Sequence, residues 1–233
     1  MKILNRIVTF ILALAVFPAI ATRIILRVVV SIAEGSTAYT LLSSIMEDTV
    51  NSAMEITVSF KEIVDYIQNG TFSFSGMNFS FDKIPAEMLV TKNWLIASAV
   101  FIVLALIIAI IIMGCALFAQ AHKTVMCFGA GGAACCFAAI SCFTKFAAPF
   151  VSGEIDIARF LGQSLLGGDG LIATLGTSVI SGAISVDVFQ LGNAIITMAI
   201  IFIGVALWTF AYFITLPTEA KVKKEKKVKA KKA

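Results

Sequence analysis

NWLIASAVFIVLALIIAIIIMGCALFAQ, at residues 93–120, is the stretch that decides the fold class of this chain. Its 28 residues include no Asp, Glu, Lys or Arg, and Trp94 stands near its start. A helix needs about 20 consecutive apolar residues to cross the hydrocarbon core of a bilayer. Tryptophan favours the boundary between lipid and water. The stretch therefore predicts a helix that spans a membrane.

The rest of the chain predicts three more spans. Hydrophobic residues make up 59% of the 233 residues, and the mean hydropathy is +0.98. A soluble core of this size cannot bury so much apolar surface, so lipid must solvate part of it. Apolar runs place the other spans at residues 1–33, 124–151 and 191–217. Because only residues 121–123 separate the second span from the third, these two helices should be antiparallel neighbours.

The first apolar run admits two interpretations. Residues 1–21 have the basic start, the apolar centre and the small-residue end of a signal peptide. The alternative is an uncleaved helix that continues to residue 33. The apolar run from residue 24 to residue 32 favours the helix, because it provides the length that a span needs.

Charge predicts the orientation. Eight of the 18 Lys and Arg residues lie in the tail at residues 218–233. Segment 34–92 carries eight acidic residues against three basic ones, and segment 152–190 carries four against one. Basic residues near spans stay on the cytoplasmic side. We therefore expect cytoplasmic N and C termini and two exoplasmic segments. The expected location is the plasma membrane, or an internal membrane if the source is a eukaryote.

The exoplasmic segments are expected to be largely helical. Leu42, Met46, Val50 and Met54 recur at every fourth position, which is typical of an amphipathic helix. Segment 152–190 is rich in glycine. We expect its residues 165–185 to form short helices on the outer surface, ahead of the alternative of a re-entrant loop that lines a pore. The predicted fold class is an all-α integral membrane protein. It is a four-helix transmembrane bundle with a largely helical exoplasmic region that carries a small β-hairpin.

The hairpin is expected at residues 71–82, TFSFSGMNFSFD, where aromatic and polar residues alternate. Strands 71–74 and 79–82 would be joined across residues 75–78. An isolated hairpin is marginally stable in water, so its apolar face needs cover, and we interpret that face as an interaction surface. A period of two gives this face the residues Phe72, Phe74, Phe79 and Phe81.

Small residues predict a packing face on the third span. Residues three and four positions apart lie on one side of a helix, and small side chains allow a close approach by another helix. We favour packing within the bundle over contact between subunits, because the second span is already a neighbour. The adjacent cysteines there indicate apolar filling and no metal or thiol site. The packing residues are Gly129, Gly132, Ala133 and Cys136.

Three basic residues at the exoplasmic ends of spans form a predicted outer basic ring: Arg23, Arg27 and Lys145. Long basic side chains at such positions reach the membrane surface. We expect this arrangement ahead of the alternative, an anion pathway. Carboxylates at the same level could pair with the ring, namely Glu34, Glu154 or Asp156.

The tail predicts contact with lipid. Its charge density is too high for a packed fold, and it directly follows a span, so anionic lipid of the inner leaflet should attract it. The predicted lipid-surface residues are Lys221, Lys223, Lys224, Lys226 and Lys227. A basic tail on a body with an acidic excess does not indicate nucleic-acid binding.

The chain offers no set of nucleophile, base and acid, so we expect neither an enzyme nor a cofactor. Four spans with two outer loops are also the layout of claudins and tetraspanins, but the loop motifs of those families are missing and no family is assigned. The favoured hypothesis is a non-catalytic multi-pass membrane protein. It would act in membrane assembly or partner binding through its exoplasmic loops, either with itself or with another membrane protein. The alternative is an oligomeric channel or transport component, with the third helix and segment 165–185 lining the path.

Overall fold

The computed structural model describes residues 2–37, 39–40, 53–61, 72–74, 77–79, 86–118, 122–154 and 184–215. Within this part of the chain, four helical segments are long and apolar enough to span a membrane: Ile3–Thr22, Asn93–Phe118, His122–Val151 and Asn193–Thr215. The prediction of four such helices is therefore confirmed.

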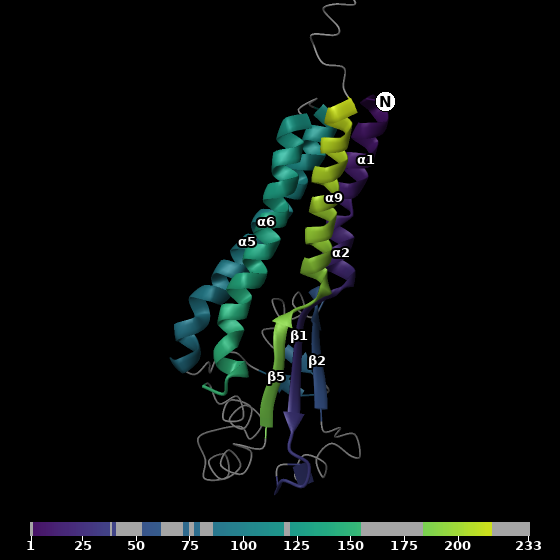
Figure 1. Ribbon diagram of the computed structural model, residues 1–233. Coiled ribbons are helices and arrows are strands. Elements are labelled where there is room, and N and C mark those ends of the chain that lie inside the picture. Colours follow the sequence, from purple (N-terminus) through teal and green to yellow (C-terminus); the bar gives the residue numbers. More distant parts are fainter. Residues whose placement is uncertain are drawn as a thin grey trace, which may run out of the picture.

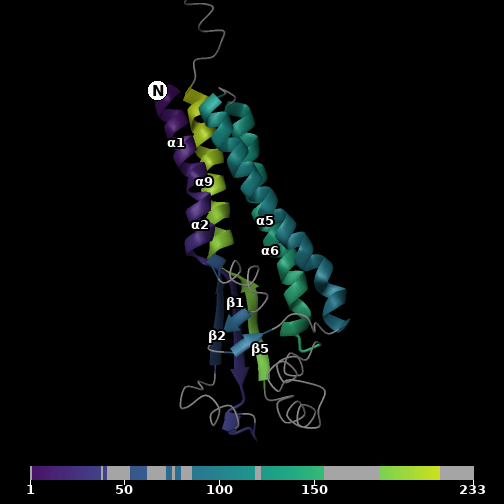
Figure 2. The ribbon, with the colours of Figure 1, turned by 180° about the vertical axis from the view of Figure 1, so that it is seen from behind.

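The helices form an elongated bundle with a small sheet at one end (Figure 1). The first span consists of α1 (Lys2–Leu14) and α2 (Val16–Thr22), and it is followed by α5 (Ala86–Phe118), α6 (His122–Val151) and α9 (Asn193–Thr215). The start of α1 and the end of α9 lie together at the end of the bundle away from the sheet (Figures 1 and 2). The end of α5 and the start of α6 lie there too, so these two helices are antiparallel neighbours as expected.

The first span is shorter than the sequence suggests. Helix α2 ends at Thr22, and Ile24–Ile32 forms strand β1, so the prediction of one helix through residue 33 is wrong. Six of the nine β1 residues are Ile or Val. These branched side chains lose freedom in a helix and fit a pleated strand. Within the span, Pro18 has no N–H to donate to the carbonyl of Leu14, which explains the short interruption between α1 and α2.

Strand β1 is the centre of a three-stranded antiparallel sheet. It lies between β2 (Ala53–Ser59) and β5 (Ile184–Leu191). The expectation of an all-α chain is therefore wrong at this end of the molecule, and the expected helix through Met54 gives way to β2. AMEITVS and ISVDVFQL both alternate apolar and polar residues, as half-buried strands do. At Met54, the two-residue alternation of a strand therefore predicts the structure correctly, and the four-residue spacing of a helix does not.

One face of the sheet is apolar and packs against α6. Val30, Val58 and Val186 are buried on it, one from each strand. Phe189, on the same face of β5, contacts Phe143, Phe146 and Phe150 of α6, with ring centroids 5.4, 5.7 and 5.4 Å away. Tilted and edge-on aromatic pairs at this spacing are favourable. The four rings therefore fix the sheet to the end of α6.

Two of the candidate spanning helices continue into the sheet almost without a loop. Only Arg23 separates α2 from β1, and only Gly192 separates β5 from α9. The N–H of Gly192 donates to the carbonyl of Ile25 at 2.6 Å. A Cβ at Gly192 would lie 2.2 Å from the carbonyl oxygen of Ile24, so only glycine fits this crossing. The sheet is thus a direct extension of α2 and α9 (Figure 1).

The hairpin at residues 71–82 is present, but its bounds differ from the prediction. Strands β3 (Phe72–Phe74) and β4 (Met77–Phe79) are antiparallel, with Phe72 opposite Phe79 and Phe74 opposite Met77. The connection is therefore two residues long, and the second strand starts at Met77 where the sequence suggested Phe79. Two-residue connections match the natural twist of paired strands, which favours this tighter turn. Phe81 lies outside the described residues.

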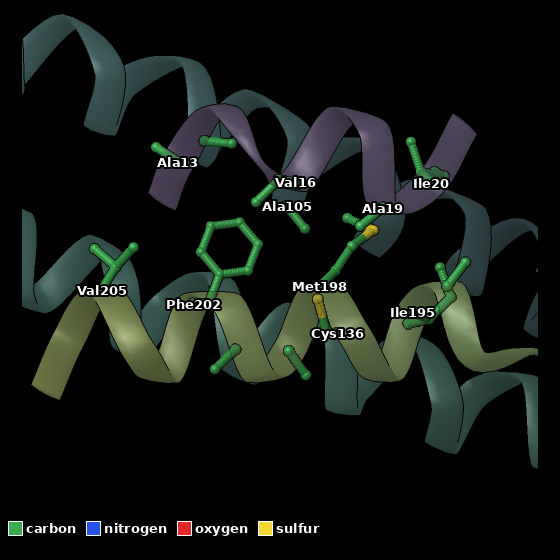
Figure 3. Close-up of a cluster of buried hydrophobic side chains, with 14 of the residues drawn as sticks. Ala13, Val16, Ala19, Ile20, Ala105, Cys136, Ile195, Met198, Phe202 and Val205 are labelled. Carbon is green, nitrogen blue, oxygen red and sulfur yellow. The ribbon is translucent and has the colours of Figure 1, made fainter. Parts of the chain in front are cut away.

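The bundle core is built from large side chains of α9 and small side chains of its neighbours. Phe202 and Met198 of α9 are fully buried, and they point toward α1 and α2 near Ala13 and Ala19 (Figure 3). Cys136 of α6 lies in the same cluster. Large residues facing small ones fill the space between helices closely, and such dispersion contacts are a main attraction between helices in lipid.

The register of the sheet can be tested by cross-linking. Ser31 and Ser185 are directly opposed, with their Oγ atoms 2.7 Å apart. We expect the double variant Ser31→Cys/Ser185→Cys to form a disulfide under mild oxidation, because directly opposed strand residues bring their Cβ atoms within reach. Mass spectrometry of the linked peptides measures the yield. The variant Ser31→Cys/Gln190→Cys should not cross-link, since Gln190 lies opposite Arg27; equal yields in both variants would contradict this register.

Candidate functional site

The polar face of the sheet is the best candidate for a functional site. It lies opposite the apolar face that contacts α6, and all of its polar side chains are at least partly exposed. They come from three strands that are far apart in the sequence. We define the polar strand face as Arg27, Ser31, Glu55, Thr57, Ser185, Asp187 and Gln190.

An ion pair joins β1 to β2 on this face. Arg27 Nε donates to Glu55 Oε1 at 2.7 Å, and Arg27 Nη2 donates to Glu55 Oε2 at 3.3 Å. The two residues are diagonal neighbours, because Arg27 lies opposite Thr57. Their side chains are 43% and 48% exposed, so the pair contributes about 1 kcal/mol or less to folding. Its main effect is to hold the Arg27 guanidinium, a donor, and the Glu55 carboxylate, an acceptor, in fixed directions.

Hydroxyl groups link β1 to a carboxylate on β5. The register passes from Val29 opposite Val188 to Val30 opposite Val186, so Asp187 is the extra residue of a β-bulge. The hydroxyls of Ser31 and Ser185 share a hydrogen bond of 2.7 Å, and Ser185 Oγ donates to Asp187 Oδ1 at 3.3 Å. Bulges redirect side chains and occur often beside functional sites. Here the bulge places an exposed carboxylate at the end of the hydroxyl pair.

The structure gives the three residues of the predicted outer basic ring different surroundings. Arg23 is exposed at the end of α2. Arg27 binds Glu55, whereas the sequence suggested Glu34, Glu154 or Asp156 as possible partners. The reason is that residue 27 belongs to a strand, and the neighbouring strand brings Glu55 within reach. Asp156 lies outside the described residues.

Lys145 interacts with the start of the second span. Its Nζ lies 4.4 Å from the centroid of the Trp94 ring. A cation over an indole face gains electrostatic stabilisation, and both side chains suit the boundary between lipid and water.

Helix α5 has 33 residues, or about 50 Å at 1.5 Å per residue, which exceeds a hydrocarbon core of about 30 Å. Part of α5 and α6 therefore extends beside the sheet.

The predicted packing residues of the third span lie on the buried face of α6. A Cβ at Gly132 would lie 2.5 Å from Phe202 Cδ1, and a Cβ at Gly129 would lie 3.0 Å from the backbone nitrogen of Ala206. Their neighbour is therefore α9, whereas the sequence suggested the second span. Ala133 and Cys136 are buried as well.

Other predicted elements lie outside the described residues: the tail at 218–233 with its lipid-surface lysines, and segment 165–185 except its last two residues, which begin β5. Within the described ranges, His, Cys, Asp and Glu form no group of three or more that suits a metal ion.

The polar strand face was not predicted from the sequence. The signal that identifies it is the alternation in AMEITVS and ISVDVFQL, where Glu55, Thr57, Ser185 and Asp187 occupy every second position.

Comparison of the chain with protein-family models, with curated proteins and with solved structures gave no match. The function is therefore argued from the site alone.

Proposed function

We propose that this protein is a non-catalytic multi-pass membrane protein that binds a protein partner through the polar strand face. The observation that carries the proposal is the attachment of the sheet: single residues, Arg23 and Gly192, join two of its strands to α2 and α9. A surface held this firmly loses little conformational freedom when it binds, so more of the contact energy is available for affinity.

The chemistry of the face indicates what the partner presents. Asp187 is exposed on a bulge, and the hydroxyl of Ser185 donates a hydrogen bond to its carboxylate. The charges of Arg27 and Glu55 balance each other, so Asp187 gives the face a net negative charge. A lysine or arginine on the partner would complement this carboxylate, and such pairs set the specificity and rate of association.

Positive residues near the spans support an exoplasmic position for this face. The sheet and the start of α1 lie at opposite ends of the bundle (Figure 2). If the N terminus is cytoplasmic, as the basic residues favour, the sheet faces the exoplasmic side. The partner is then another membrane protein or a second copy of this chain.

The alternative, a channel lined by the third helix, has less support. Phe202 covers Gly132, and Ala206 packs on Gly129. The small-residue face of α6 is thus filled by α9 within one chain. A path along this face would require the two helices to separate.

The proposal is tested with a photoreactive amino acid at Gln190, which is exposed on the polar strand face. In native membranes, we expect illumination to give one defined adduct, and the same probe at the lipid-facing position Ile107 should not give it. Asp187→Lys should lower the adduct yield at least about tenfold, because like charges at an interface cost well over 1.4 kcal/mol. The mass of the adduct distinguishes a second copy of the chain from another protein.

The matched control is Glu154→Lys, the same charge change at an exposed carboxylate outside the polar strand face. It should leave the yield unchanged. An adduct that survives Asp187→Lys, or that both variants reduce equally, would contradict binding through this face.

A further inference from the structure

The end of the bundle opposite the sheet contains a small polar cavity that all four spans line. Its volume is about 10 Å³, with Asn5 and Thr9 of α1, Cys115 of α5, His122 of α6 and Thr209 of α9 among its walls. A cavity of roughly 10–15 Å³ has room for one water molecule. The proposed partner surface lies at the other end of the molecule, so this cavity is a separate site.

Two buried polar atoms at this cavity have no hydrogen-bond partner among the described residues: Asn5 Oδ1 and Thr9 Oγ1. Asn5 is 4% exposed and Thr9 is 3% exposed. The amide nitrogen of Asn5 lies 3.3 Å from His122 Nδ1, so only the oxygen of this side chain lacks a partner. Buried polar atoms in folded proteins almost always make a hydrogen bond to protein or to ordered water.

The two atoms define the chemistry of the ligand. An amide oxygen only accepts hydrogen bonds, whereas a hydroxyl can donate and accept. An anion would not bind the amide oxygen, and the positive charge of Arg6, a residue that also lines the cavity, disfavours a metal cation. A neutral molecule of one heavy atom that both donates and accepts satisfies these conditions.

We propose that one water molecule is bound in this cavity, donating to Asn5 Oδ1 and hydrogen-bonded to Thr9 Oγ1. The bound water completes a polar cluster that fixes α1 against its neighbours. Asn5 contacts His122 of α6, and the His122 ring meets the Tyr212 ring of α9 edge-on at 5.0 Å. Apolar helices in lipid gain little from the hydrophobic effect, so polar contacts of this kind define how they are rotated and aligned.

The first test is the thermal stability of Thr9→Val in the full-length, detergent-solubilised protein. Valine keeps the shape of threonine and removes the hydroxyl. We expect the variant to unfold about 2–4 °C lower than the wild type, because the water loses a partner. An increase in the unfolding temperature would overturn the proposal, since it would mean that the hydroxyl is buried without any partner. Thr197→Val is the control, because the Thr197 hydroxyl binds the Asn193 carbonyl of its own helix.

The second test observes the water directly and does not depend on how the variant folds. A high-resolution experimental structure of the wild-type chain should show a density peak about 2.7–3.2 Å from both Asn5 Oδ1 and Thr9 Oγ1. The peak should disappear in Thr9→Val if that variant folds. A wild-type map without a peak, or with density that continues into a lipid headgroup, would overturn the proposal.

Discussion

Gly192→Ala is expected to destabilise the protein by about 3 kcal/mol or more, which corresponds to a fall of roughly 6–12 °C in the unfolding temperature. The added Cβ would lie 2.2 Å from the carbonyl oxygen of Ile24 and 2.6 Å from its carbonyl carbon. Both are backbone atoms of the neighbouring strand, so no side chain can rotate away to make room. The change should also weaken the hydrogen bond from Gly192 N–H to Ile25, which closes the crossing between β1 and the start of α9.

Gly204→Ala provides the control for Gly192→Ala. Gly204 lies in the same helix that Gly192 precedes, and nothing lies within 4 Å of a Cβ placed on it. Because alanine favours a helix over glycine by up to about 1 kcal/mol, this variant should be as stable as the wild type or slightly more stable. Thermal unfolding followed by circular dichroism measures both variants. Equal unfolding temperatures for the two variants would contradict the close approach of Gly192 to the Ile24 backbone.

Gly132→Ala is expected to cost about 1–3 kcal/mol, because its Cβ would meet a fully buried aromatic ring. The distances would be 2.5 Å to Phe202 Cδ1 and 2.6 Å to Phe202 Cε1, and Phe202 is 0% exposed. The adjacent position is the matched control. Gly131 has open space around its Cβ position, so Gly131→Ala should be neutral or mildly stabilising through helix propensity alone.

A second substitution tests the cause of the expected loss at Gly132. Phe202→Leu removes the ring edge, so it should destabilise the wild type but cost less in the presence of Gly132→Ala. Double-mutant cycles between contacting residues give coupling energies of about 0.5–3 kcal/mol, and we expect a coupling in this range. Unfolding measurements on the four proteins give it. Strictly additive effects would show that Gly132 and Phe202 are not in contact.

The four long apolar helices were predictable because each carries its own signal. Residues 93–120 predict a span from their composition alone, and α5 contains nearly all of them. The end of the first helix was not predictable in this way. A new apolar run begins directly after Arg23, and an apolar strand resembles an apolar helix in hydropathy. Only the proportion of Ile and Val in IILRVVVSI distinguishes the two.

The polar strand face was harder to predict because it depends on pairing. The alternation in AMEITVS indicates a strand, but nothing local shows that Glu55 will meet Arg27 or that Ser185 will meet Ser31. The requirement for glycine at position 192 has the same origin, since the carbonyl that excludes a side chain belongs to Ile24. The strand pairing and the requirement for glycine at position 192 could not be predicted, because both depend on contacts between segments far apart in the chain.

The sheet also sets the relative height of two of the long apolar helical segments. β1 and β5 are hydrogen-bonded neighbours, and each continues directly into a span. A slip of one strand residue would move α2 past α9 by about 3.4 Å, or more than two helix residues at 1.5 Å each. It would also turn every strand side chain to the opposite face. Small sliding movements of these two helices are thus excluded while the ladder is intact, and α2 and α9 cross the bundle as one rigid unit. Any change of shape in the helical bundle must then keep the relative height of α2 and α9.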